Sequence, residues 1–204
     1  MRPIDELTRT WTALGIPSPW PFQRETVEAC LGHGNVILIA PTGSGKTWAA
    51  IAPFVHARRT GVPFADRLIY TLPLRTLAVA LYEGVRDRLA PLGITATIQT
   101  GAMPYDPYFS KGDVVFTTID QLLSAYAGVP VSLSDAAASI PAGAIVGAHV
   151  VFDEFHLLET GKSLATALDL ADRLGRFCRV LLMSATCPRP VVEELARRTA
   201  ARVV

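Results

Sequence analysis

The segment APTGSGKT, residues 40–47, limits what this chain can fold into more than any other feature. The apolar run Val36 to Ala40 leads into it and is typical of a strand buried on both faces, and a segment of helical length follows it. Glycines in such a loop let successive backbone N–H groups converge on phosphate oxygens at the positive end of the helix. The order of strand, loop and helix therefore predicts a P-loop, with Ala40 in place of the first glycine of the general pattern. A glycine-rich turn that only caps a helix is the alternative.

The residues of this loop have expected roles in binding a nucleoside triphosphate. Lys46 would neutralise the β- and γ-phosphates, and the Thr47 hydroxyl would take one position around magnesium. The expected cofactors are therefore ATP and Mg2+. The predicted cofactor-binding residues of the loop are Thr42, Gly43, Ser44, Gly45, Lys46 and Thr47.

Two adjacent carboxylates follow a second apolar run in the segment VVFDEFH, residues 150–156. Open parallel sheets bind their ligands at the carboxyl ends of strands, so these carboxylates are expected near the P-loop. Asp153 would hold magnesium, and Glu154 would orient and deprotonate the water that attacks the γ-phosphate. His156 and Lys46 complete the predicted catalytic set. The alternative is an acidic pair that only caps a helix N-terminus.

Short apolar runs alternate with amphipathic segments of helical length, which is the signature of βαβ units. We therefore predict an α/β domain with a mainly parallel sheet sandwiched between helices. The predicted strands are Val36 to Ala40, Leu68 to Thr71, Thr95 to Gln99, Val114 to Thr117, His149 to Phe152 and Val180 to Met183. The predicted helices are Phe22 to Leu31, Lys46 to Arg58, Leu74 to Leu89, Ile119 to Tyr126, Lys162 to Leu174 and Arg189 to Thr199. Residues Ala127 to Gly147 are expected to form a surface loop with one short helix.

Length and composition favour one domain that includes a helical extension at residues 1–21. The 204 residues, 50% of them hydrophobic, suffice for one well-buried α/β core. The three cysteines are widely spaced and fit a reduced chain, and the acidic, amphipathic N-terminus is wrong for a signal peptide. The most apolar stretch is too short to span a bilayer, so we expect a cytoplasmic protein with no membrane partner. A net charge of +1 neither favours nor excludes nucleic acid.

Further segments help to distinguish between two interpretations of the chain, a generic ATP-binding domain and a motor that acts on nucleic acid. Gln23 precedes the P-loop, where its amide can bind an adenine edge through one donor and one acceptor. The hydroxyls of Ser184 and Thr186 are expected to bond the acidic segment and to couple nucleotide state to a partner domain. Residues 71–77 and 116–121 place hydroxyls, backbone amides or an arginine just past a strand, at helix starts suited to phosphate contact. Caps, turns and ordinary polar helix residues are the alternatives.

The ordered set Gln23, APTGSGKT, TLPLRTL, Gln99-Thr100-Gly101, TTIDQ, DEFH and SAT resembles the first RecA-like domain of superfamily 2 helicases. The phrases PLRTLAVALYEGV, TTIDQLLSAYA and VVFDEFHLLE are similar to those of the CRISPR-associated helicase-nuclease of type I interference systems. That resemblance implies an ATP-driven translocase on single-stranded DNA in antiviral defence. Its implied partners are a CRISPR effector complex and an HD nuclease domain. It also implies nucleic-acid backbone contacts by Arg75, Thr76, Thr100, Gly101, Thr118 and Gln121.

Two other functions stay open. One is an RNA helicase of the DEAD/DEAH kind, and the other is a nucleotide-binding or docking module without turnover. The intact set of Lys46, Asp153 and Glu154 counts against the second. We expect the chain to be the N-terminal part of a longer protein whose second RecA-like domain supplies arginine fingers. Because such a finger is worth roughly three to five powers of ten in rate, the chain alone should hydrolyse ATP poorly.

Overall fold

A parallel β-sheet is the element on which the rest of this α/β fold is built. The computed structural model describes residues 3–129, 133–158 and 162–204. Within these residues a 7-stranded sheet runs in the order β3-β4-β2-β5-β6-β1-β7, with every pair of neighbouring strands parallel. The strands are β1 (Val36–Ile39), β2 (Leu68–Leu72), β3 (Ala96–Gln99), β4 (Val114–Thr118), β5 (His149–Phe152), β6 (Arg179–Ser184) and β7 (Arg202–Val203). The predicted strands are confirmed with small shifts at their ends, and the short edge strand β7 was missed.

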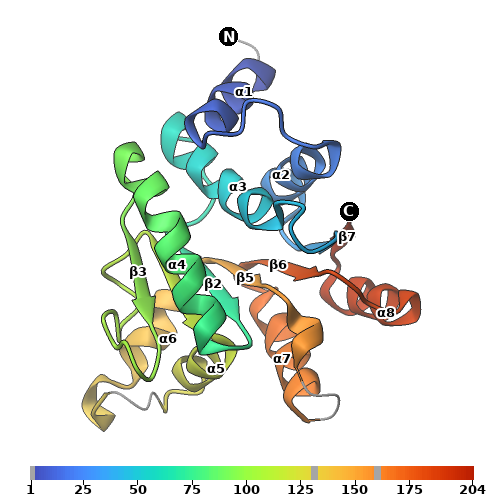
Figure 1. The fold of residues 1–204 in the computed structure, drawn as a ribbon. Coiled ribbons are helices and arrows are strands. Elements are labelled where there is room, and N and C mark those ends of the chain that lie inside the picture. Colours follow the sequence, from blue (N-terminus) through green and yellow to red (C-terminus); the bar gives the residue numbers. More distant parts are fainter. Residues whose placement is uncertain (1–2, 130–132, 159–161) are drawn as a thin grey trace.

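Helices cover both faces of the sheet, as the sequence pattern predicts (Figure 1). One face carries α1 (Pro3–Ala13), α2 (Pro21–His33), α3 (Lys46–Thr60) and α4 (Arg75–Leu89). The other carries α5 (Ile119–Tyr126), α6 (Ser139–Ile145), α7 (Lys162–Leu174) and α8 (Arg189–Thr199). Single turns of 3-10 helix lie at η1 (Ala90–Leu92), η2 (Asp135–Ala137) and η3 (Phe155–Leu157). Alternate strand residues point to opposite faces, so Leu38 packs in the first apolar layer and Ile37 in the second.

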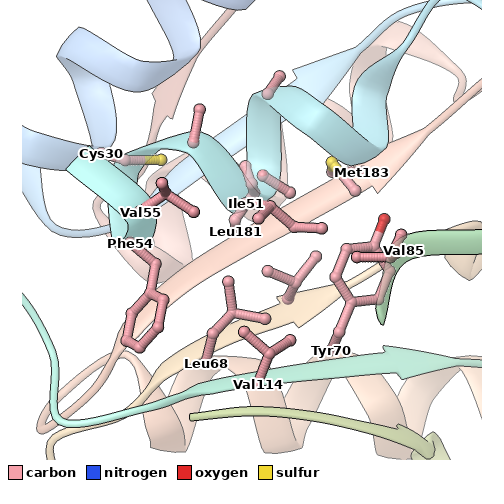
Figure 2. Packing of buried hydrophobic residues seen from close by; sticks show 14 of the residues in the cluster. Cys30, Ile51, Phe54, Val55, Leu68, Tyr70, Val85, Val114, Leu181 and Met183 are labelled. Atoms are coloured by element: carbon pink, nitrogen blue, oxygen red, sulfur yellow. The ribbon is translucent and has the colours of Figure 1, made fainter. Parts of the chain in front are cut away.

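The P-loop helix α3 is held in the most apolar part of the molecule. Ile51, Phe54 and Val55 are fully buried in one cluster with residues of the sheet. Figure 2 shows them facing Leu68 of β2 and Leu181 of β6. On its other side α3 packs against α1 and α2. A helix that is apolar nearly all round has to be covered on every side, so the helix that follows the P-loop is fixed in place.

The irregular region between α5 and β5 is partly helical. The structure forms η2 and the seven-residue helix α6 there, which agrees with the expected loop and one short helix. Pro141 and Ile145 of α6 are buried, so this helix contributes to the second apolar layer. Residues 130–132 of the region lie outside the described residues.

The structure offers no membrane-crossing element among the residues that it describes. None of their helices combines the length and the apolar character that crossing a bilayer requires.

His149 is a fully buried titratable group at the start of β5. Its Nδ1 lies 3.2 Å from the carbonyl oxygen of Arg179, and its ring packs 5.1 Å from the ring of Phe64. Burial lowers the pKa of His149 from 6.5 to about 4, and the charge of Arg179 acts in the same direction. The folded protein therefore holds this imidazole neutral at a pH where the unfolded chain would protonate it.

This difference in pKa predicts a loss of stability in mild acid. Above pH 6.5 the imidazole is neutral in both states, and its contribution to stability is complete. As the pH falls from 6.5 to about 4, only the unfolded chain gains the proton, and the free energy of unfolding decreases. The total loss is on the order of 3 kcal/mol, at about 1.4 kcal/mol for each pKa unit. Urea unfolding at a series of pH values measures it.

The matched variant is His149→Asn, whose side-chain amide can still donate to the Arg179 carbonyl but does not titrate. Its free energy of unfolding should change less over this pH interval than that of the wild type. Burial also lowers the pKa of His56, but His56 is present in both proteins, so the difference between them isolates His149. Equal pH dependence of the two proteins would contradict the assignment.

Candidate functional site

The predicted chemical groups meet at one edge of the sheet because of the strand order. Strands β5, β6 and β1 are neighbours, and all are parallel. The acidic segment follows β5, Ser184 ends β6, and the P-loop follows β1. Parallel strands bring their carboxyl ends to the same edge, which is where open sheets bind ligands. We call the loops after these three strands the nucleotide edge.

Lys46 lies at the centre of the nucleotide edge. Its side chain is buried, and its ammonium group donates hydrogen bonds to the carbonyl oxygens of Ala40 (3.0 Å) and Pro41 (3.2 Å). The same nitrogen forms an ion pair with Glu154 Oε1 at 3.4 Å. The P-loop and the acidic segment are therefore in direct contact, as the sequence predicts. Phosphate oxygens that bind here would compete with these partners for the ammonium group.

Asp153 is almost fully buried and hydrogen-bonded at both carboxylate oxygens. Oδ2 accepts a 2.6 Å hydrogen bond from the Tyr70 hydroxyl, and Oδ1 accepts one of 2.9 Å from the Glu154 backbone N–H. Burial raises the pKa of Asp153 above its ordinary value, while the bond from Tyr70 and the nearby Lys46 oppose that rise. The carboxylate is thus fixed in orientation before any ligand arrives.

Glu154 is held in an unusual backbone conformation. Its φ of 51° lies in the left-handed region, which non-glycine residues rarely adopt and which often marks a functional site. Its Oε2 is buried without a hydrogen-bond partner and lies 3.3 Å from His156 Nδ1. This carboxylate oxygen therefore has acceptor capacity left, with His156 Nδ1 as its near neighbour.

Ser184 connects the acidic segment to the end of β6. Its Oγ lies 3.1 Å from His156 Nδ1 and donates a 2.6 Å hydrogen bond to the Thr186 carbonyl. Because the single hydroxyl proton goes to Thr186, the His156 nitrogen has to be the donor in the other bond. Ser184 therefore contacts His156 through its side chain as predicted, whereas the contacts between Ser184 and Thr186 involve the Thr186 backbone.

A cavity of about 300 Å³ opens between the P-loop and the acidic segment. Its lining residues are Thr42, Gly43, Gly45, Lys46, Thr47, Trp48, Asp153 and Glu154. A hydroxyl and carboxylates are the hard oxygen donors that Mg2+ prefers, and the lysine and the glycine backbone suit phosphate oxygens. The residues present therefore fit a magnesium-bound nucleoside triphosphate. Ser44 lies in the same loop, and its hydroxyl donates to the Pro41 carbonyl at 2.7 Å.

Gln23 is buried at the start of α2, and its amide holds the P-loop. Its Nε2 donates a 3.0 Å hydrogen bond to the Gly45 carbonyl, and its Oε1 accepts one of 2.8 Å from the Trp20 N–H. Gly45 has a φ of 88°, and a Cβ atom there would lie 2.6 Å from the Gln23 nitrogen. The positive φ favours glycine at this position, and any larger residue would displace the Gln23 amide. A side-chain amide has a second N–H and a second lone pair, so adenine binding by Gln23 stays a prediction.

The predicted nucleic-acid contacts lie on the other half of the same edge, on the loops after β2, β4 and β3. We call these loops the outer edge. Arg75, Thr76 and Gly101 are exposed there, and Gln121 is partly buried. The side chains of Thr100 and Thr118 are buried, and the Thr100 hydroxyl accepts a hydrogen bond from the Met103 N–H. The predicted nucleic-acid contacts of these two residues stay a prediction.

Comparison with known proteins decides the family. The model of the DEAD/DEAH box helicase family matches residues 20–195. The chain belongs to the DEAD/DEAH box helicase family. Among curated relatives, the ATP-dependent RNA helicase dbp10 of Schizosaccharomyces pombe is 29% identical over 184 residues, which cover 88% of this chain and 20% of the relative. A Neurospora crassa relative with the same description, dbp-10, is 30% identical over 198 residues, covering 92% and 19%. This DEAD/DEAH box helicase chain thus spans about a fifth of the length of these relatives.

Solved structures show that the helicase chain has the RecA-like fold. The DUF1998 helicase MrfA, bound to DNA and AMPPNP, superposes with a TM-score of 0.73 at 20% identity, covering 98% of this chain and 28% of that one. S. cerevisiae Dbp5, bound to RNA and ADP BeF3, gives a TM-score of 0.70 at 19% identity, covering 100% and 50%. At these identities the likeness supports the fold alone.

Tyr70 is one residue of the site that the sequence motifs do not reveal, and Trp48, which lines the cavity, is another. Tyr70 lies inside β2, in the apolar run LIYTL, where a bulky hydrophobic residue is expected. A tyrosine in a fully buried strand needs a partner for its hydroxyl, and that requirement is the signal that could have found it. The partner here is Asp153.

The Gln23 contact yields a test of the helicase site. Gln23→Glu keeps the acceptor for Trp20 but places a carboxylate oxygen against the Gly45 carbonyl. We expect affinity for both ATP and GTP to fall about tenfold, the equivalent of one hydrogen bond. Titration with fluorescent analogues of the two nucleotides measures it.

The matched control is Gln121→Glu on the outer edge, which should leave nucleotide affinity unchanged. A further loss for ATP beyond that for GTP in Gln23→Glu would support the adenine contact. Unchanged GTP affinity in Gln23→Glu would show that the bond to Gly45 does not shape the P-loop.

Proposed function

We propose that this chain is the nucleotide-binding half of an ATP-dependent helicase that acts on RNA. The observation that carries the proposal is the convergence of Lys46, Thr47, Asp153 and Glu154 on one cavity. The curated relatives named above are RNA helicases, which supports RNA over DNA as the nucleic acid.

The residues of the nucleotide edge have complementary parts in this function. ATP with Mg2+ would supply the phosphoryl group whose hydrolysis drives movement. Lys46 would exchange its carbonyl and Glu154 partners for phosphate oxygens, and Thr47 and Asp153 would present oxygen ligands to the metal ion. Release from Lys46 leaves the Glu154 carboxylate available to orient and deprotonate water.

The exchange of partners at Lys46 also connects ATP binding with the availability of Glu154. While Lys46 pairs with Glu154 at 3.4 Å, the ammonium group occupies one oxygen of that carboxylate. Phosphate oxygens that attract the ammonium group would weaken this pair. Binding of the substrate would therefore free the carboxylate that is proposed to act as general base.

Substitutions at these two residues test the ATPase function. Lys46→Ala should lower ATP affinity at least about tenfold because it removes a buried charge-assisted contact to phosphate. Glu154→Gln should keep ATP binding and slow hydrolysis by about a hundredfold or more, since only the base is lost. Binding is measured on the 204-residue chain, and hydrolysis on a protein extended to include a second RecA-like domain.

Lys111→Ala, at an exposed lysine outside the site, is the matched control and should change neither quantity. If the extended wild-type protein binds ATP without hydrolysing it, a nucleotide-binding or docking module is the better description.

A second candidate is a translocase on single-stranded DNA of the CRISPR-associated type, with an effector complex and an HD nuclease as partners. Its support is the set of phrases around Pro73, Thr117 and Val150 that resemble that subfamily. The superposition on MrfA, described as bound to DNA, shows that the RecA-like fold also serves DNA. The sequence phrases are therefore the observation that keeps this candidate open.

Stimulation by nucleic acid separates the two candidates. We expect ATP hydrolysis by the extended protein to be stimulated by single-stranded RNA more than by DNA of the same sequence and length. Arg75→Ala should weaken binding of every sequence alike and reduce the salt dependence by about one phosphate contact. Arg24→Ala, at an exposed arginine on α2, is the matched control. Stimulation by DNA alone would overturn the RNA proposal in favour of the second candidate.

A further inference from the structure

Tyr70 is a polar group in the middle of an apolar cluster. The side chain is fully buried in β2, and Figure 2 shows its ring among the apolar residues of that cluster. The ring lies 5.5 Å from that of Phe116 on β4, and Phe116 lies 6.2 Å from the ring of Tyr82 on α4. These contacts fix the ring, so the position of the phenol oxygen is fixed as well.

The phenol hydroxyl donates a 2.6 Å hydrogen bond to Asp153 Oδ2, on the nucleotide edge. A phenol has one proton, so Tyr70 is the donor and the Asp153 carboxylate is the acceptor.

This bond leaves Asp153 able to bind a metal ion. Each Asp153 oxygen accepts one hydrogen bond and has lone-pair capacity left. Tyr70 lies on β2, the strand next to β5, and so holds Asp153 from a neighbouring element. Thr47, the other expected ligand, lies in the first turn of α3 and lines the same cavity as Asp153.

We propose that Tyr70 is a positioning residue that holds the Asp153 carboxylate in the orientation that Mg2+ requires. The inference rests on the proposed function, which assigns the metal to Asp153 and Thr47. Mg2+ demands near-ideal octahedral geometry and tolerates little error in ligand placement. Groups that orient metal ligands typically change metal affinity about 10- to 100-fold when they are removed.

A purely structural role is the competing explanation. The hydroxyl of Tyr70 also satisfies a buried carboxylate, so its loss would destabilise the fold whether or not a metal binds. The two roles differ in one measurable quantity. Only a positioning role changes how nucleotide binding depends on Mg2+ concentration.

The test is Tyr70→Phe in the 204-residue chain, with binding of fluorescent ADP titrated against Mg2+ and repeated in EDTA. We expect the Mg2+ concentration for half-maximal enhancement of binding to rise about tenfold, and binding in EDTA to stay unchanged. Tyr82→Phe removes a phenol from the same aromatic group, away from Asp153, and should leave the Mg2+ dependence unaltered. An unchanged Mg2+ dependence in Tyr70→Phe, whatever its stability, would overturn the inference.

A second measurement covers the case in which Tyr70→Phe does not fold. Placing 3-fluorotyrosine at position 70 keeps the hydroxyl and the ring, and its fluorine resonance reports the surroundings of the phenol. We expect this resonance to shift when Mg2+ is added to the chain with ADP, and to shift much less with ADP in EDTA. A fluorine resonance whose position does not change when Mg2+ is added would overturn the inference.

Failure of this inference and failure of the proposed function give different experimental results. If the wild-type chain binds ADP without any dependence on Mg2+, the assignment of the metal to Thr47 and Asp153 fails, and the positioning role fails with it. If the wild type depends on Mg2+ and Tyr70→Phe depends on it equally, the site stands and only the role of Tyr70 is wrong.

Discussion

Parallel strands bring all of their carboxyl ends to one edge of a sheet, and the candidate site depends on that constraint. The P-loop and the acidic segment are more than a hundred residues apart in sequence, yet Lys46 Nζ lies 3.4 Å from Glu154 Oε1. The strand order places β6 between β1 and β5, which leaves a cavity between the two loops. The same geometry puts the outer edge next to the nucleotide edge, with β2 at the boundary.

Burial of charge at this edge is costly, and the structure offsets the cost by pairing the charges with one another and with fixed dipoles. Lys46 has two carbonyl oxygens and a carboxylate as partners, and Asp153 has a phenol and a backbone amide. Such a network is tolerated when each member is satisfied, and removing one partner leaves an expensive buried charge. Glu154 Oε2 is the exception, a buried acceptor without a hydrogen bond. Glu154, the group with an unused acceptor oxygen, is thus the residue that is predicted to accept a proton.

The sequence predicts those parts of the fold and site that local pattern determines. Continuous apolar runs such as VILI are strong enough to locate buried strands, and the P-loop is specific because strand, glycines and helix occur in order. Strand β7 is missed because two residues carry no periodicity and depend on pairing with β1. The Gln23 contact with Gly45, the burial of Thr100 and the role of Tyr70 depend on distances across the folded chain. No local pattern in the sequence encodes such distances.

Strand β2 is the physical connection between the two halves of the edge. Its Tyr70 reaches the nucleotide edge through Asp153, and the helix that begins at Arg75 follows the same strand on the outer edge. Tyr82 of that helix meets Tyr70 through the ring of Phe116, so strand and helix also share a packed aromatic contact. Tightly packed interiors transmit displacement because they have few voids in which to absorb it. A ligand that displaced the start of α4 would therefore act on the strand whose Tyr70 hydroxyl is bonded to Asp153.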